Sequence, residues 1–158
     1  MPLDPSIVGR KGGRSRIVIE RSAVSNFARA IKDPNPIYQD ETAAKAAGFS
    51  NIPAPPTFLI GASSWGTYPE HQPSDPGDNP MSEIVMQYAK DGGLLLHGEQ
   101  GFTFERPVVV GDVLDGEAEC VDAYTKGSMT FGVVEVRYTD AETGELVATA
   151  RYNMINRQ

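Results

Sequence analysis

The sequence is poor in the residues that build disulfides and metal centres: its 158 residues include one cysteine and two histidines. A single cysteine excludes an intramolecular disulfide, and these three side chains are too few for a structural zinc site with the usual four ligands. We therefore expect no metal and no other cofactor. The lone cysteine also favours a reducing, cytoplasmic setting.

Positive charge and long apolar runs are scarce as well. The chain has 14 Lys and Arg against 21 Asp and Glu, a net charge of −7, so it lacks the positive field that nonspecific binding to nucleic acid or to an anionic membrane needs. The first residues have neither the basic region nor the apolar core of a secretion signal, and no stretch approaches the roughly 18 apolar residues of a membrane helix. We expect neither nucleic acid nor a membrane as a partner.

The length and the 40% apolar content are typical of one compact domain, which we predict to span residues 1–158. Residues 1–16 contain several glycines and prolines, and we expect them to form a lead-in arm rather than packed structure. Five basic residues cluster in and just beyond this arm, where they are able to bind anions: Arg10, Lys11, Arg14, Arg16 and Arg21.

Helical patterns dominate the first half of the chain. A short β-branched segment at 17–20 precedes a helix that Ser22 is expected to cap, and a second short helix starts at Asp40 and ends at Gly48. Residues 57–65 are apolar or small nearly all round, which is typical of a helix buried on most sides. We expect this segment to be the central helix, followed by a long exposed loop and a short helix at 82–90.

In the second half, the hydrophobic period changes from that of a helix to that of a strand. Four successive strands are predicted at 101–106, 113–124, 128–138 and 146–156, with a turn at 111–112 between the first two. Together these elements predict an α+β domain in which an antiparallel sheet wraps a central helix, the hot-dog fold. Because such a sheet leaves an open edge, we expect a dimer.

The densest polar cluster is the loop from Asp33 to Asp40, which reads Asp-Pro-Asn-Pro-Ile-Tyr-Gln-Asp. Its two prolines stop the preceding helix and stiffen the loop. From the residue types alone, the better interpretation is an Asx turn followed by a helix N-cap. A functional interpretation of this loop depends on its resemblance to a known family.

The loop, the helix ending in Gly-Phe after it, and the proline-rich segment that follows resemble the MaoC-like (R)-specific enoyl-thioester hydratase and 3-hydroxyacyl-thioester dehydratase family, in which the loop reads D-x-N-P-x-H. Residues 104–114 resemble the family's second signature. The Ala-Pro-Pro-Thr-Phe run at 54–58 and the His-Gly-Glu-Gln run at 97–100 are similar to the FAS1-like dehydratase subgroup, including non-catalytic subunits of heteromeric dehydratases.

In that family, as the resemblance implies, Asp and His flank the double bond while a backbone N–H near the central helix holds the thioester oxygen. This chain keeps Asp33 but has Tyr38, with an ordinary pKa of about 10, at the histidine position, and Pro55 and Pro56 offer no N–H. Asp33 and Tyr38 are therefore degenerate catalytic positions. The residues expected to bind substrate are Asn35, Pro55, Pro56, Thr57, Phe58, Trp65 and His97.

Several of these candidates also have structural interpretations. His97 at the start of a strand is more simply a packed or hydrogen-bonded side chain, and Phe58 and Trp65 more often line a core than a substrate. His71 lies in a polar loop, and Cys120 lies mid-strand as a buried, inert thiol would, so neither is given a role.

Three functions fit the sequence. The first is an acyl-thioester-binding subunit of a heteromeric hydratase or dehydratase, which pairs with a D-x-N-P-x-H chain that supplies Asp and His. The second is a self-sufficient hydratase or dehydratase with an altered base, and the third is a hot-dog thioesterase or acyl-thioester-binding protein, for which residues 57–64 lack the expected carboxylate. The acyl group is expected on coenzyme A or acyl carrier protein; its length, the carrier and the direction of reaction stay open.

Overall fold

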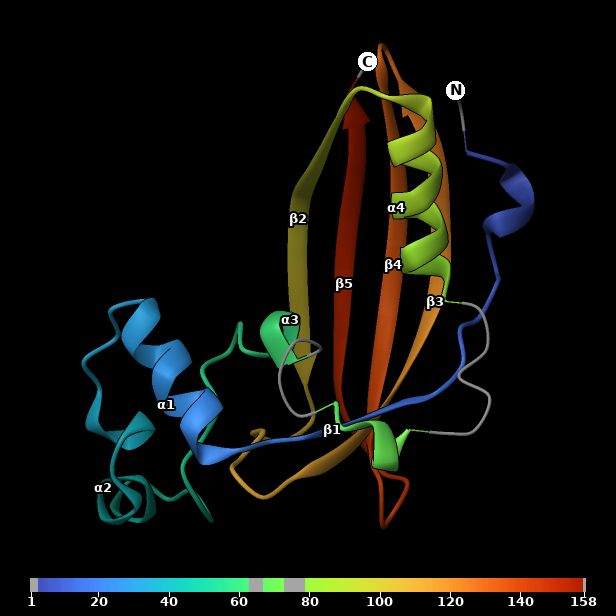
Figure 1. Cartoon of the computed structure of the whole chain (residues 1–158). Helices are drawn as coiled ribbons and strands as arrows, with labels where there is room; N and C mark the ends of the chain where they lie inside the picture. Colours follow the sequence, from blue (N-terminus) through green and yellow to red (C-terminus); the bar gives the residue numbers. More distant parts are fainter. Residues whose placement is uncertain (1–2, 63–66, 73–78, 158) are drawn as a thin grey trace.

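The computed structural model describes residues 3–62, 67–72 and 79–157. Five antiparallel strands form one sheet in the order β1-β3-β4-β5-β2. The strands are β1 (Ser15–Val18), β2 (Leu94–Phe104), β3 (Val113–Lys126), β4 (Met129–Asp140) and β5 (Leu146–Arg157). The α-helices are α1 (Arg21–Ala30), α2 (Glu41–Ala46), α3 (Leu59–Ala62) and α4 (Pro80–Asp91), and the 3₁₀ turns are η1 (Pro5–Ile7), η2 (Pro36–Tyr38) and η3 (Pro69–His71). The sheet curls around α4, which confirms the α+β hot-dog fold (Figure 1).

Of the four successive strands expected in the second half, β3, β4 and β5 pair in sequence order, but the strand before them does not pair with β3. β2 pairs with β5, whereas the short β1 lies beside β3. The turn at Gly111 and Asp112 therefore ends a connection that runs from one side of the sheet to the other, and the prediction that it joins neighbouring strands is wrong. As a result β2 is an edge strand over its whole length (Figure 1).

Two β-bulges lie at the same level of the sheet and bend it. They fall at 97–99 in β2 and at 120–122 in β3, and the shared level passes through Asn153 of β5. At the first bulge Gly98 leaves room for the Ile155 side chain, because a Cβ there would lie too close to Cδ1 of Ile155. Bulges increase local twist, so this pair helps the sheet to curl around its helix.

The central helix is α4, which contacts β2, β3, β4 and β5. Its side chains Ile84 and Tyr88 lie one turn apart and pack with Cys120 and Val134 on the concave face. The prediction of the central helix at 57–65 is therefore wrong. The described part of that segment contains only the single turn α3, whose apolar residues pack at the foot of the sheet, and Trp65 lies outside the described residues.

The chain packs onto the sheet from Leu3 onward, so the expectation of an unpacked lead-in arm at 1–16 is wrong for the described part of that segment. Leu3 and Ile7 are 4% and 3% exposed and join the cluster beneath α4. The backbone runs beside β3, where the N–H of Gly9 donates to the carbonyl of Cys120 at 2.7 Å. Glycine and proline weaken helices, but they do not prevent this extended pairing.

The helices α1 and α2 form a lobe at the foot of the sheet (Figure 1). Helix α1 starts two residues earlier than expected, with Glu20 at its N-cap position and no side-chain capping bond, so Ser22 is not its cap. Helix α2 starts as predicted: the N–H of Ala43 donates to Oδ1 of Asp40 at 2.7 Å. Gly48 follows the helix with a φ of +93°, a conformation that favours glycine.

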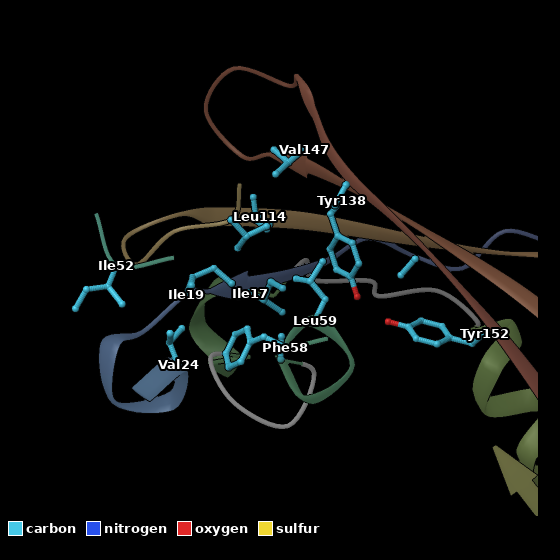
Figure 2. Packing of buried hydrophobic residues seen from close by; sticks show 14 of the residues in the cluster. Ile17, Ile19, Val24, Ile52, Phe58, Leu59, Leu114, Tyr138, Val147 and Tyr152 are labelled. Atoms are coloured by element: carbon cyan, nitrogen blue, oxygen red, sulfur yellow. The ribbon is translucent and has the colours of Figure 1, made fainter. Parts of the chain in front are cut away.

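The larger core cluster joins this lobe to the sheet. Figure 2 shows Val24 of α1, Ile17 of β1 and Leu114 of β3 gathered around Phe58. The Phe58 ring meets that of Phe27 edge to face, with centroids 5.5 Å apart. Within the described ranges, no helix is long and apolar enough to cross a membrane.

Candidate functional site

The motif loop is held by its own side chains. Oδ1 of Asp33 accepts the N–H of Asn35 at 3.0 Å, and Oδ1 of Asn35 in turn accepts the N–H of Ile37 at 3.2 Å. These are the Asx turns expected from the residue types, and the second one starts η2. One carboxylate oxygen of Asp33 is thus already engaged with the backbone.

Turn η2 places Tyr38 with its side chain facing the protein interior. Tyr38 is 9% exposed, and its carbonyl accepts the hydroxyl of Ser25 on α1 at 2.9 Å. Burial, together with the nearby carboxylate of Asp33, raises the pKa of Tyr38 above its ordinary value. The phenol therefore keeps its proton at neutral pH, so it is able to donate a hydrogen bond but not to act as a base.

Tyr38 lines a pocket of about 320 Å³, which we call the loop pocket. Its walls come from the motif loop, from the proline-rich segment and from the chain that follows β2, and they include Ile37, Tyr38, Phe49, Pro56, Phe104, Glu105 and Arg106. The proline-rich segment and the chain that follows β2 are joined, because the N–H of Ala54 donates to the carbonyl of Val108 at 2.8 Å. The two signatures of the family resemblance therefore meet in one mostly apolar pocket.

The remaining candidates of the proline-rich segment have different surroundings. Pro56 is exposed and lines the loop pocket, whereas the neighbouring Pro55 is buried and its carbonyl accepts the N–H of Phe58 at 2.8 Å. Thr57 is half-buried, with its carbonyl accepting the N–H of Ile60. Phe58 is 1% exposed and packs in the core, as its structural interpretation predicts.

His97 lies away from the motif loop, at the rim of a second pocket. This helix–sheet pocket, of about 420 Å³, lies between α3, the start of α4 and the concave face of the sheet. His97 is exposed, and its ring centroid lies 6.0 Å from that of Tyr152. The candidates from the sequence are therefore divided between two pockets.

Two residues of the helix–sheet pocket had no place in the sequence interpretation. Tyr138 and Tyr152 are 7% and 5% exposed, and they line the pocket from neighbouring strands. Strand alternation marks both as inward-facing positions, which is the one signal that the sequence offers. It does not show that the two hydroxyl groups meet, because that depends on the register of β4 and β5.

The basic cluster near the N-terminus is paired within the chain. Arg16 binds Asp115 through two hydrogen bonds of 2.8 and 2.9 Å, and Arg14 lies 3.6 Å from the same carboxylate. Arg10 pairs with Glu83, Lys11 with Glu117 and Glu119, and Arg21 donates to the carbonyl of Gln39. Most of the positive charge that was considered for anion binding is thus neutralised locally.

No metal centre emerges from the described residues, which contain no group of three or more His, Cys, Asp or Glu side chains able to hold an ion. Cys120 is buried and free, and burial raises the pKa of its thiol. A thiol in that state is a poor nucleophile.

Solved structures share this fold along almost the whole chain. The (3R)-hydroxyacyl-ACP dehydratase complex HadBC of Mycobacterium tuberculosis matches with a TM-score of 0.73 and 21% identity, covering 99% of this chain and 100% of that one. The ChsH1-ChsH2 complex of the same organism matches with a TM-score of 0.70 and 23% identity, over 97% and 90% of the two chains. These likenesses establish the fold.

Sequence relatives and a family model are more specific. A UPF0336 protein of Parafrankia sp. (strain EAN1pec) is 35% identical over 99% of this chain and 96% of its own, and one of Saccharopolyspora erythraea is 33% identical over 99% and 93%. The model described as "FAS1-like, dehydratase domain region" matches residues 6–150. Since that match takes in both signatures and nearly every element of the fold, the chain belongs to the FAS1-like dehydratase family.

Proposed function

We propose that this protein is the acyl-thioester-binding subunit of a heteromeric (R)-specific enoyl-thioester hydratase or (3R)-hydroxyacyl-thioester dehydratase. A partner chain with the D-x-N-P-x-H motif supplies the catalytic Asp and His. The acyl group arrives on coenzyme A or acyl carrier protein, and the enzyme works in the cytoplasm, where the Cys120 thiol stays reduced.

The observation that carries this proposal is the state of Tyr38 in the loop pocket. Forming an enolate next to a thioester needs a base with a pKa near the working pH and hydrogen-bond donors for the oxygen. By its resemblance to the family motif, Tyr38 takes the position of the base, and burial pushes its pKa further from neutrality. Pro56, which lines the same pocket, has no N–H to donate. The scaffold is kept while both chemical functions are weakened.

The open edge of β2 supports a partner chain. Residues 94–99 are all exposed, and they include three consecutive leucines, with Leu94 56% exposed. Unpaired backbone groups beside exposed leucines favour pairing with another strand. Among the solved neighbours, HadBC and ChsH1-ChsH2 are complexes of two chains by name. We propose that the partner pairs along β2, which brings its residues close to His97.

A self-sufficient enzyme is the second candidate, and one observation favours it. Glu105 lines the loop pocket with Tyr38 and is a carboxylate that could accept a proton in place of histidine. A hot-dog thioesterase has less support, because residues 57–62, the described part of the segment where its carboxylate was expected, contain no Asp or Glu.

Water addition to an enoyl thioester separates these functions. We would assay this chain alone, a D-x-N-P-x-H chain from the same genome alone, and the mixture. Loss of a general base typically costs about 10²–10⁴-fold in rate, so we expect this chain alone to be slower than the mixture by that order. The mixture should be insensitive to Tyr38→Phe and should lose activity when the partner's histidine is replaced.

Full turnover by this chain alone would contradict the subunit proposal. Glu105→Gln then tests the second candidate, with Glu142→Gln, an exposed carboxylate in the β4–β5 turn, as the matched control. Thioester hydrolysis without water addition would favour the thioesterase instead.

A further inference from the structure

The floor of the helix–sheet pocket carries a pair of facing phenols in otherwise mostly apolar surroundings. Tyr138 and Tyr152 project from neighbouring strands, and Figure 2 shows their hydroxyl groups pointing toward one another, with Leu59 beside Tyr138. The two phenols share a side-chain hydrogen bond. Both residues are more than nine-tenths buried, and both line the pocket.

The hollow exists because small residues lie opposite these rings. Gly116 is the cross-strand partner of Tyr138, and a Cβ there would lie 3.1 Å from the Tyr138 ring. Ala118 continues the same face and also lines the pocket. Ile84 and Tyr88 of α4 fill the concave face further along, near Cys120 and Val134, and leave this part of the floor uncovered.

The tyrosine pair has one hydrogen-bond donor more than its mutual hydrogen bond uses. Each phenol has one O–H donor and can accept through its oxygen. Their mutual hydrogen bond uses the proton of one phenol and an acceptor site of the other, so one of the two protons is left to donate. A donor that lines a mostly apolar pocket is suited to a ligand that brings an acceptor oxygen.

We propose that the Tyr138–Tyr152 pair is a hydrogen-bond donor site for an oxygen of the bound acyl chain, either the thioester carbonyl or a hydroxyl near it. This inference rests on the proposed acyl-thioester function and adds the residues that recognise oxygen within the helix–sheet pocket. The apolar walls, such as Leu59, Val85 and Met154, hold the hydrocarbon. The tyrosine pair then fixes how deeply the chain enters.

Three pantetheine probes with the same chain length separate the two oxygens. One is a saturated thioester, which has the carbonyl alone; one is a 3-hydroxyalkyl thioether, which has the hydroxyl alone; and one is an alkyl thioether with neither oxygen. Calorimetry would measure binding to the wild-type chain, to the Tyr138→Phe/Tyr152→Phe double variant and to Tyr124→Phe. Tyr124 lies on the opposite face of the sheet, 41% exposed and stacked on Phe131, and is the matched control.

For the wild-type chain we expect at least one oxygen-bearing probe to bind about 3- to 10-fold more tightly than the oxygen-free thioether, the usual contribution of one neutral hydrogen bond. The double variant should lose this preference while its affinity for the oxygen-free thioether stays within about twofold, and Tyr124→Phe should keep it. A wild-type chain without the preference, or a double variant that retains it, would overturn the inference while leaving acyl binding intact. If none of the probes bound the wild-type chain, the proposed function itself would fail, and this inference with it.

Discussion

Single glycines determine how closely the elements of this protein approach. Gly132 of β4 lies under α4, and a Cβ there would come within 2.9 Å of Cδ1 of Ile84 and 3.0 Å of Cδ1 of Leu3. The helix and the N-terminal segment therefore both press on one position of the sheet. Their close packing depends on the absence of a side chain there.

We predict that Gly132→Ala destabilises the protein by about 1–3 kcal/mol, the usual cost of an overpacked core. Urea unfolding would measure this change. The control is Gly101→Ala in β2, where a Cβ would meet nothing within 4 Å; it should change stability by less than about 1 kcal/mol. Equal effects of the two substitutions would show that α4 does not press on Gly132.

The buried tyrosines are expected to make the stability of the protein depend on pH in the alkaline range. Burial is the largest cause that raises the pKa of Tyr88 and of Tyr152 in the folded state. In the unfolded chain a tyrosine titrates near pH 10. Since the unfolded state releases these protons first as the pH rises, the stability that they contribute is fully present below about pH 10 and is lost above it.

Tyr88→Phe isolates one of these groups, because the Tyr88 hydroxyl is buried without a hydrogen-bond partner. At pH 7 we expect this variant to be as stable as the wild type or more so. Between pH 10 and 11.5 its free energy of unfolding should fall less steeply, by up to about 1.4 kcal/mol per pH unit. A slope identical to that of the wild type would contradict the pKa shift of Tyr88.

Among the elements, the short strand β1 is held to the sheet by an ion pair as well as by its backbone pairing. The strand has four residues and pairs with β3 on one side only. Arg16 lies directly across from Asp115 in the register, and their side chains form a two-bonded pair in which the carboxylate is 6% exposed. A two-bonded Arg–carboxylate pair is specific in geometry as well as strong. It fixes β1, and with it the start of α1, against the sheet.

We predict that Asp115→Asn lowers the free energy of unfolding by about 1–3 kcal/mol, because the change weakens a hydrogen-bonded charge pair with one buried partner. The matched control is Glu119→Gln on the same strand, whose carboxylate lies 3.6 Å from the exposed Lys11. That substitution should cost less than about 1 kcal/mol. Urea unfolding would measure the free energy of unfolding of both variants. Equal losses in the two would contradict a special stabilising role of the Arg16–Asp115 pair.

At the scale of the whole molecule, the edge strand β2 is open to pairing with another chain. Within the described part of the chain no strand lies beside its outer side, and Leu94 and Leu96 are 56% and 36% exposed. The edge lacks the lysines, prolines and short length by which monomeric proteins protect such strands. A second chain is therefore expected to cover it.

We predict that the pure protein sediments as a dimer and that Leu96→Lys shifts it toward the 17.1 kDa monomer while the fold is retained. Analytical ultracentrifugation at micromolar concentration measures both species. Met86→Lys is the control, because Met86 is 59% exposed but lies on α4 rather than on the edge. A wild-type protein that is stably monomeric at this concentration would contradict a self-pairing edge and leave only the heteromeric partner.

Local chemistry in the sequence determined much of this protein. Strand alternation predicted β3, β4 and β5 to within a few residues, and Asp40 and Gly48 bound α2 as expected. The Asx turns of Asp33 and Asn35 also follow from their residue types. These features depend on contacts between residues near one another in the chain, so the sequence alone specifies them.

Only the tertiary structure decided which elements meet. It made α4 rather than 57–65 the central helix, packed residues 3–12 onto β3, and moved β2 to the far edge. It also placed the candidate residues in two separate pockets and brought the hydroxyl groups of Tyr138 and Tyr152 together. The physical reason is that hydrophobic burial is not directional: an apolar pattern shows that a face is buried, whereas strand register and chain crossing decide what it is buried against.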